Sequence, residues 1–268
     1  MKRFKGFAWP YFAWLILFTV FPAVLMIVLS FLSSNGMDFS SAYFSFASFA
    51  RLKDPAILKA LANSLYVAFM TVVLCLLLGY PTAYFLSFGP FKKKKLLLLL
   101  LILPMWSNSM LRIVSWLRLF SVPWLSPLHA LGSYWAVILV SVATYIPFMI
   151  FPIFTVLEKM DRGLLEASHD LGLPSWRGFL KVTLPLSMKG VYSGIIMVFL
   201  PASTGFAISE AIGEGRIRLI GNLLEAVFKQ NNFNFGSLLS LFVSLVLILL
   251  MVVFDRLQEG KKGGKAHA

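Results

Sequence analysis

The chain has 268 residues, of which 59% are hydrophobic and only 13% are charged, and its mean hydropathy is +0.84. Soluble domains are roughly half apolar and one-quarter charged, so this composition excludes an ordinary soluble fold and predicts an all-α integral membrane protein. The net charge of +13 would suggest nucleic-acid binding in a soluble protein. In a membrane chain this charge is interpreted by its position relative to the spans, and we expect no nucleic-acid partner.

Uncharged stretches predict where the chain crosses the membrane, since about 20 apolar residues at about 1.5 Å each cross a hydrocarbon core of about 30 Å. The third of these stretches, Leu96–Leu111, is followed by Arg112 and Arg118. On a straight helix, Arg112 would reach the opposite interface and extend toward headgroups or backbone carbonyls. The six predicted spans are Tyr11–Leu32, Asn63–Phe88, Leu96–Leu111, Ser133–Leu157, Gly190–Ser209 and Gly236–Phe254.

The positions of the basic residues predict the orientation of these spans. If both termini are cytoplasmic, the inner segments hold 16 of the 24 lysines and arginines. Positively charged loops stay on the cytoplasmic side, so we expect an N-in, C-in, multi-pass protein of the bacterial cell membrane, in contact with its lipid. The first apolar run is longer than the core of a signal peptide, so we expect it to be a retained span.

No motif of an enzyme or a metal site is present. Cys75 lies in an uncharged run and is expected to be a small core residue. The basic segment Gly260–Lys265 is too short for a phosphate-binding loop and lacks its hydroxyl residue. His129, His169 and His267 are widely scattered. We therefore predict no catalytic residue, no metal site and no cofactor bound by this chain.

A polar stretch, Glu166–Pro185, separates the fourth and fifth predicted spans on the cytoplasmic side. Asp161 can cap a short helix, and Gly172 follows it where a left-handed terminating residue is favoured. Ser175 is a candidate N-cap for a second short helix, which Pro185 is expected to end. The pattern predicts a helix–turn–helix bracket that contacts a partner, or alternatively an amphipathic hairpin lying on its own membrane surface.

The same stretch resembles the EAA loop of ABC-importer permeases. It has the sequence Glu-Ala-Ser, a glycine six residues after the glutamate, and a closing Val-Thr-Leu-Pro. In that family, the loop is the coupling helix that docks onto a separate ATPase. The resemblance implies a coupling loop over residues 158–189, with ATPase-coupling residues Glu166, Ala167, Ser168, Asp170, Gly172, Leu184 and Pro185.

Further segments resemble the PotB-like spermidine/putrescine permeases: Leu103–Trp116, Phe199–Gly215, Leu219–Gln230 and Phe233–Leu241. The resemblance implies a MetI-like permease fold with six transmembrane helices in a single domain, residues 1–268. It also implies an ATP-driven importer in which two ATPase subunits bind ATP and Mg²⁺. The other implied partners are a second, non-identical permease subunit and an extracytoplasmic substrate-binding protein.

The fifth predicted span contains Pro201 and Gly205, which interrupt helical hydrogen bonding. Broken membrane helices are tolerated where they line a cavity, so this segment is a candidate for the substrate pathway. A structural kink without a pathway role is the alternative. In the pathway interpretation hydroxyl groups hydrate the route and a glutamate meets the cation at the entrance, with candidate residues Pro201, Ser203, Thr204, Phe206, Ser209 and Glu210.

Two alternatives to a polyamine importer remain open at this stage. An importer of the same class could carry another small solute, such as ferric iron, thiamine or an oxyanion. A channel or secondary transporter would work without ATP, and an ion-coupled one is expected to carry an ionisable residue within its spans. The uncharged spans do not provide one.

Overall fold

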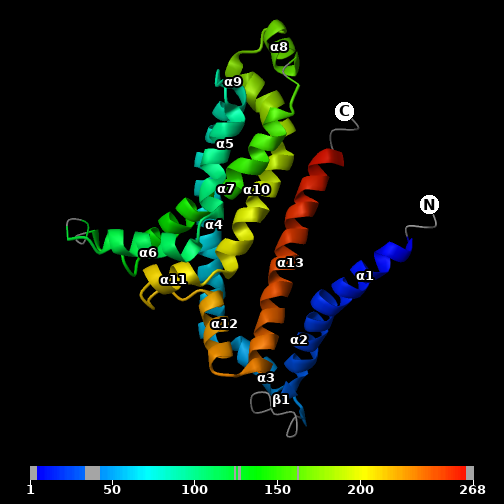
Figure 1. Ribbon diagram of the computed structural model, residues 1–268, viewed down its shortest axis with the longest axis vertical. Coiled ribbons are helices and arrows are strands. Elements are labelled where there is room, and N and C mark those ends of the chain that lie inside the picture. The colour runs from blue at the N-terminus through cyan, green and yellow to red at the C-terminus, as the bar shows by residue number, and fades with distance from the viewer. Residues whose placement is uncertain (1–4, 34–42, 124, 126–127, 162, 264–268) are drawn as a thin grey trace. The chain divides into compact units, whose positions relative to one another are not determined.

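The computed structural model describes residues 5–33, 43–123, 125, 128–161 and 163–263. Helices account for most of these residues, together with one short antiparallel pair of strands, β1 (Leu32–Ser33) and β2 (Tyr43–Phe44). The chain divides into two compact units, which are described separately below (Figure 1). Residues 1–59 and 223–268 form the first unit, and residues 60–222 form the second.

In the first unit, the N-terminal and C-terminal helices pack against each other. The side-chain amide of Asn234 donates hydrogen bonds to the carbonyls of Leu29 (3.1 Å) and Leu32 (2.8 Å) at the C-terminal end of α2, where helix carbonyls need donor groups from beyond the helix itself. The unit contains α1 (Lys5–Leu15), a π-helical segment η2 (Ile16–Val20), α2 (Phe21–Phe31), α3 (Ala47–Ala50), η4 (Arg51–Lys53) and α13 (Phe233–Gly263).

The second unit holds the buried core and most of the shorter helices. Helix α4 begins in the first unit and continues into the second. Helix α12 begins in the second unit and ends in the first. The elements are α4 (Pro55–Phe88), α5 (Lys94–Ile102), η5 (Leu103–Trp106), α6 (Ser109–Phe120), α7 (Tyr134–Glu158), α8 (Gly163–Asp170), α9 (Ser175–Gly178), η7 (Phe179–Thr183), α10 (Leu184–Thr204), α11 (Ala207–Ile212) and α12 (Ile220–Lys229).

Helices α7 and α10 pack closely because two glycines lie at their interface. A Cβ atom on Gly190 would lie 2.8 Å from the Pro152 carbonyl oxygen, and one on Gly194 would lie 2.6 Å from the Met149 sulfur. Small residues four positions apart allow membrane helices to approach this closely. Cys75 is fully buried in the same core, as the sequence predicted.

Five of the six predicted spans are long helices. By length and composition, Trp9–Phe31, Pro55–Phe88, Tyr134–Glu158, Ser175–Thr204 and Phe233–Val253 can each cross a membrane. The prediction of a straight third span is wrong. Lys94–Trp106 and Ser109–Phe120 are two segments bent by 86° at a short break, and together they are at most one interrupted span.

Candidate functional site

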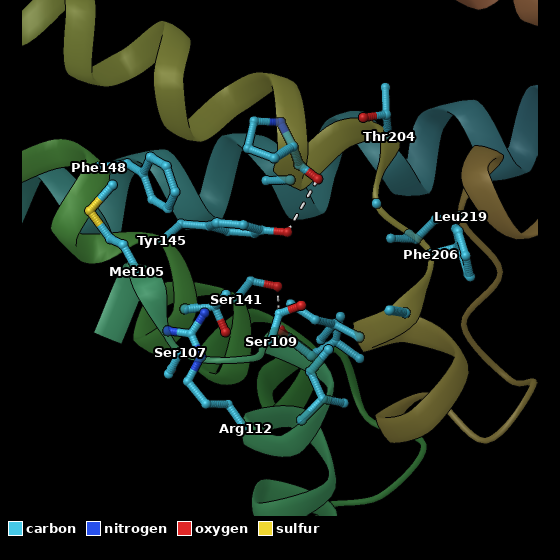
Figure 2. A pocket seen from close by; sticks show the side chains of 18 residues that line it. Met105, Ser107, Ser109, Arg112, Ser141, Tyr145, Phe148, Thr204, Phe206 and Leu219 are labelled. Atoms are coloured by element: carbon cyan, nitrogen blue, oxygen red, sulfur yellow. Dashed lines mark hydrogen bonds between the residues drawn. The ribbon is translucent and has the colours of Figure 1, made fainter. Parts of the chain in front are cut away.

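A cavity of about 440 Å³ lies within the second unit, where two interrupted helices meet α7 (Figure 2). One wall comes from the break between η5 and α6, and the opposite wall comes from the break between α10 and α11. Six of the lining residues carry hydroxyl groups: Ser107, Ser109, Ser141, Thr144, Tyr145 and Thr204. The cavity is therefore lined mostly by apolar residues, among which these hydroxyl groups form a polar part.

The first break is stabilised by Asn108. Its side-chain oxygen accepts hydrogen bonds from the backbone N–H groups of Met110 (2.9 Å) and Leu111 (3.4 Å). Because an N-cap side chain satisfies the free donors of a new helix, α6 can start in a new direction after η5 ends at Trp106. Arg112 consequently lines the cavity, and the expectation that it extends to the opposite interface is wrong.

The second break lies where the sequence predicted it. Proline at position 201 has no N–H group to donate within α10. Gly205 is extended (φ −65°, ψ 139°) and donates its N–H to the Pro201 carbonyl at 2.9 Å. The Tyr145 hydroxyl donates to the same carbonyl at 3.4 Å (Figure 2). The Pro201 carbonyl at the break thus accepts a second hydrogen bond from α7, in addition to the one from Gly205.

Arg112 is the one charged residue among the described residues that line this cavity. Its Nε and Nη1 atoms are buried, and neither has a hydrogen-bond partner in the part of the chain that the structure describes. Figure 2 shows the side chain rising from α6 toward the side of the cavity where Ser107, Ser141 and Tyr145 lie. Burying guanidinium N–H groups without an acceptor is costly, so these two nitrogens favour an acceptor group from outside the described residues.

Three of the six candidate pathway residues, Pro201, Thr204 and Phe206, line the cavity. Ser203 does not. Its side chain is 2% exposed, and its hydroxyl donates to the Leu200 carbonyl at 2.9 Å.

The other two candidates, Ser209 and Glu210, belong to a hydrogen-bond network around Asn222. The Ser209 hydroxyl donates to the Asn222 side-chain oxygen at 2.6 Å, and the Asn222 amide donates to the Glu210 carboxylate at 2.8 Å. The same Asn222 oxygen accepts from the backbone N–H of Leu219 at 3.0 Å. The network fastens α11 to the start of α12, and neither candidate lines the cavity.

Sequence reasoning missed the contribution of α7 to the cavity. Ser141, Thr144, Tyr145 and Phe148 all line it and follow the i, i+3, i+4, i+7 spacing of one helix face. The grouping of three hydroxyl-bearing residues on one face of an otherwise mostly apolar span was the signal that could have identified them. Among the residues that the structure describes, no three His, Cys, Asp or Glu side chains are grouped so that they could hold a metal ion.

The second candidate site is the polar stretch between α7 and α10, at the other end of α7 from the cavity. The Asp161 carboxylate accepts from the N–H of Gly163 at 2.9 Å and so caps α8, as predicted. Gly172 has a φ of +79°, and the N–H of Leu173 donates a hydrogen bond to the Ser168 carbonyl at 3.1 Å. These two features define the predicted left-handed helix terminus.

The second half of this stretch differs from the prediction. Pro174, and not Ser175, precedes the first turn of α9, and its carbonyl accepts from the N–H groups of Arg177 and Gly178. Pro185 does not end the helix, because α9, η7 and α10 run on without interruption. The π-helical turn of η7 widens the hydrogen-bond pattern just before Pro185, which accommodates a residue that has no N–H.

The coupling residues named from the resemblance are mostly exposed. Glu166, Ala167, Asp170, Gly172 and Pro185 are exposed, and Leu184 is partly buried. Ser168 is buried, and its hydroxyl donates to the Leu165 carbonyl at 2.7 Å.

The two most exposed large apolar side chains of this polar stretch are Leu171 and Trp176. Leu171 is 83% exposed and Trp176 is 60% exposed. The guanidinium of Arg177 lies 5.1 Å from the Trp176 ring centre. The stretch therefore presents apolar and charged side chains together at its surface, which is typical of a contact for another protein.

Comparisons with known proteins agree with this architecture. Residues 75–260 match the family described as the binding-protein-dependent transport system inner membrane component. The spermidine/putrescine transport system permease protein PotB of Escherichia coli (strain K12) is 35% identical over 257 residues, which cover 91% of this chain and 93% of that protein. PotB of Haemophilus influenzae is 33% identical over 258 residues, covering 91% of this chain and 90% of that protein.

A solved structure has the same fold. The bacterial alginate ABC transporter, crystallised in complex with an alginate pentasaccharide-bound periplasmic protein, contains a chain that superposes with a TM-score of 0.72. The two chains are 15% identical, and 93% of each is covered. This chain therefore has the fold of an ABC-transporter permease, and it belongs to the family of binding-protein-dependent transport system inner membrane components. It is a multi-pass transport permease of the inner membrane.

Proposed function

We propose that this chain is a permease subunit of an ATP-driven importer for polyamines such as spermidine and putrescine. The observation that carries the proposal is the identity of 33–35% to PotB permeases across 91% of the chain. In this proposal the chain forms part of the path through the membrane. An extracytoplasmic protein delivers the cargo, a second permease subunit completes the path, and the chain lies with both termini in the cytoplasm.

The cavity supports a path for an ammonium-bearing solute. Five of its hydroxyl groups already donate their protons to backbone carbonyls, so their remaining lone pairs are available to accept from an ammonium group. These five bonds are Ser107 to Pro104 (2.8 Å), Ser141 to Val137 (2.7 Å), Thr144 to Val140 (2.7 Å), Tyr145 to Pro201 (3.4 Å) and Thr204 to Leu200 (2.9 Å). Since no carboxylate of the described residues lines the cavity, it would bind a polyamine weakly and let it pass.

Coupling to ATP hydrolysis is assigned to residues 158–189. We infer that this loop docks onto one of two ATPase subunits, which bind ATP and Mg²⁺. The exposed side chains of Leu171 and Trp176 supply apolar area for the contact, and the exposed Glu166 supplies a charge. Because α7 and α10 leave this loop and continue to the cavity, movement of the loop would be transmitted to the cavity wall.

A small anion is the second candidate cargo. The observation that favours it is Arg112, whose partially buried guanidinium is the one formal charge that the described residues place on the cavity wall. An oxyanion would satisfy this charge directly.

One reconstitution separates the candidates. The chain is purified with its cognate second permease and ATPase and placed in proteoliposomes, and the cognate binding protein is added outside. We expect ATP-dependent uptake of labelled spermidine, which excess putrescine reduces and excess phosphate or sulfate does not. Uptake without ATP would instead indicate a channel or secondary transporter, and inhibition by the oxyanions alone would indicate an anion importer.

The orientation can be tested in sealed cells. Cysteines placed at Lys93 and Ser175 should resist a membrane-impermeant thiol reagent, whereas cysteines at Asp54 and Asn232 should react. Labelling of the Ser175→Cys variant from outside would overturn the N-in, C-in arrangement.

A further inference from the structure

Arg112 is difficult to reconcile with a path for a polycation. A guanidinium that lines the cavity repels an ammonium group, and no Asp or Glu side chain among the described residues lines the same cavity to offset it. With Nε and Nη1 buried and unpaired within the described chain, Arg112 has the chemistry of one half of an ion pair. The question is what supplies the other half.

The neighbouring side chains in this chain do not supply it. The hydroxyls of Ser107, Ser141 and Tyr145 are bonded to backbone carbonyls, and none of their oxygens forms a hydrogen bond with Arg112 Nε or Nη1. The Glu210 carboxylate is bonded to Asn222 and does not line the cavity. Within the described part of the chain, Arg112 therefore has no anionic partner.

We propose that Arg112 pairs with a carboxylate side chain of the second permease subunit. The inference rests on the proposed function, because it requires that second subunit. The cavity is accessible to another chain, since Ser107, Ser109, Thr204 and Phe206 line it and are themselves exposed. This chain thus contributes the cationic, hydroxyl-rich part of the path, and its partner contributes the acidic part.

A fixed carboxylate fits this position better than a soluble anion. A soluble anion would leave with the polyamine as an ion pair, and the guanidinium would then be buried without a partner after each transport cycle. A carboxylate on the partner stays in place and can exchange partners. An arriving ammonium group displaces Arg112 from the carboxylate, and the return of Arg112 displaces the ammonium group. Arg112 therefore limits how long the cavity retains a polycation.

Carbodiimide cross-linking tests the pairing directly. In the Arg112→Lys variant, the amine should lie against the same carboxylate. Treatment of the assembled complex with dicyclohexylcarbodiimide, which enters membranes, should then join them through an amide bond with loss of water to the reagent. Peptide mass spectrometry should identify a link between α6 of this chain and an Asp or Glu of the second permease. The Arg118→Lys variant is the matched control, because Arg118 is exposed on the same helix and does not line the cavity.

Transport by neutral variants provides the second measurement. Arg112→Gln should leave the partner carboxylate free, so the purified complex should retain labelled spermidine that the wild type releases. Maximal uptake should fall by roughly tenfold or more. Arg112→Lys should keep most of the uptake, and Arg118→Gln should behave as the wild type. A merely structural role for Arg112 would lower complex yield without increasing spermidine retention.

The outcomes separate this inference from the proposed function. If the wild-type complex imports no polyamine, the proposed function is wrong whatever the cross-link shows. If the wild type imports polyamine, a cross-link to Glu210 or to another residue of this chain overturns the pairing with the partner. The pairing is equally overturned if no cross-link forms and Arg112→Gln transports normally, or if chloride removal alone reproduces the Arg112→Gln behaviour.

Discussion

The cavity and the loop at the opposite end of α7 depart from the usual placement of polar and apolar side chains in opposite ways. Around the cavity, a guanidinium and six hydroxyl-bearing residues face inward from helices that are otherwise apolar. On the loop, Leu171 and Trp176 face outward from a polar segment. In both places a side chain lies in surroundings that do not suit it. Because contact with another molecule would suit such side chains better, we propose these two regions as the places where this permease meets cargo and partners.

The two regions also differ in how their backbone is held. At the cavity, helices are interrupted, and the side chains of Asn108 and Tyr145 form hydrogen bonds with backbone groups at the two breaks. On the loop, backbone hydrogen bonds among the described residues hold the turn at Gly172, and open space surrounds the position that a Cβ would occupy. Between the two regions, α7 and α10 form a close-packed connection through Gly190 and Gly194. Separate substitutions can therefore disturb either region or the connection.

The largest effect is expected at the connection. In Gly190→Leu the Cβ atom alone would lie 2.8 Å from the Pro152 carbonyl oxygen, so α7 and α10 must move apart to admit the side chain. We expect a loss of stability of about 3 kcal/mol or more, and both ATPase binding and uptake should be lost. Thermal unfolding in detergent measures the first effect. Ser193→Leu is the control, since Ser193 is exposed on the same helix, and a similar loss there would contradict the explanation.

Removal of the exposed apolar side chains should affect the loop alone. Leu171→Ser combined with Trp176→Ser should weaken ATPase association by about 2–4 kcal/mol, or roughly 30- to 1,000-fold, because the contact loses two large apolar groups. The thermal stability of the permease should not change. Leu249→Ala serves as the control, because Leu249 is 55% exposed on α13. Unchanged copurification of the ATPase with the double variant would indicate that the loop is only a surface hairpin.

Substitutions at Gly172 test the turn of the loop by itself, because the position restricts its residue through a left-handed backbone conformation and not through neighbouring side chains. Its φ is +79°, and beyond its two chain neighbours no described atom lies within 4 Å of the place that a Cβ would take. Gly172→Val should therefore cost about 1–2 kcal/mol through strain and not through a clash. Gly172→Asn should be closer to the wild type, because asparagine tolerates the left-handed region. The measurement is spermidine uptake per ATP hydrolysed. Equal coupling in the valine, asparagine and wild-type proteins would show that the turn angle has no role.

The smallest effect is expected from cysteine substitutions at two adjacent residues near the cavity. Thr204 lines it and is exposed, whereas Ser203 is 2% exposed and does not line it. Thr204→Cys should react with a small soluble thiol reagent at a rate that changes when nucleotide is supplied, and Ser203→Cys should remain unreactive. The native Cys75 is buried and should contribute little background. Equal reactivity at positions 203 and 204 would remove the assignment of this wall to the cavity.

The sequence predicted the parts of both sites that depend on local chemistry. Asp161, Gly172, Pro201 and Gly205 act on the backbone within a few residues of their own positions, so their effects on the helices could be inferred without a fold. Local sequence could not show that Thr204 lines the cavity while Ser209 and Glu210 do not. Whether these polar side chains face a cavity or bond to Asn222 depends on a segment more than ten residues further along the chain.

The sequence by itself determined that this protein is a membrane permease, because the uncharged spans and the Glu-Ala-Ser to Leu-Pro loop are properties of contiguous residues. Only the tertiary structure decided where Arg112 lies and where Pro185 lies within a continuous helix. Arg112 enters the cavity because the Asn108 cap lets α6 turn by 86°, and α10 continues through Pro185 because a π-helical turn absorbs the missing N–H. Both outcomes depend on how backbone hydrogen bonds are completed in three dimensions, which the order of residue types does not fix.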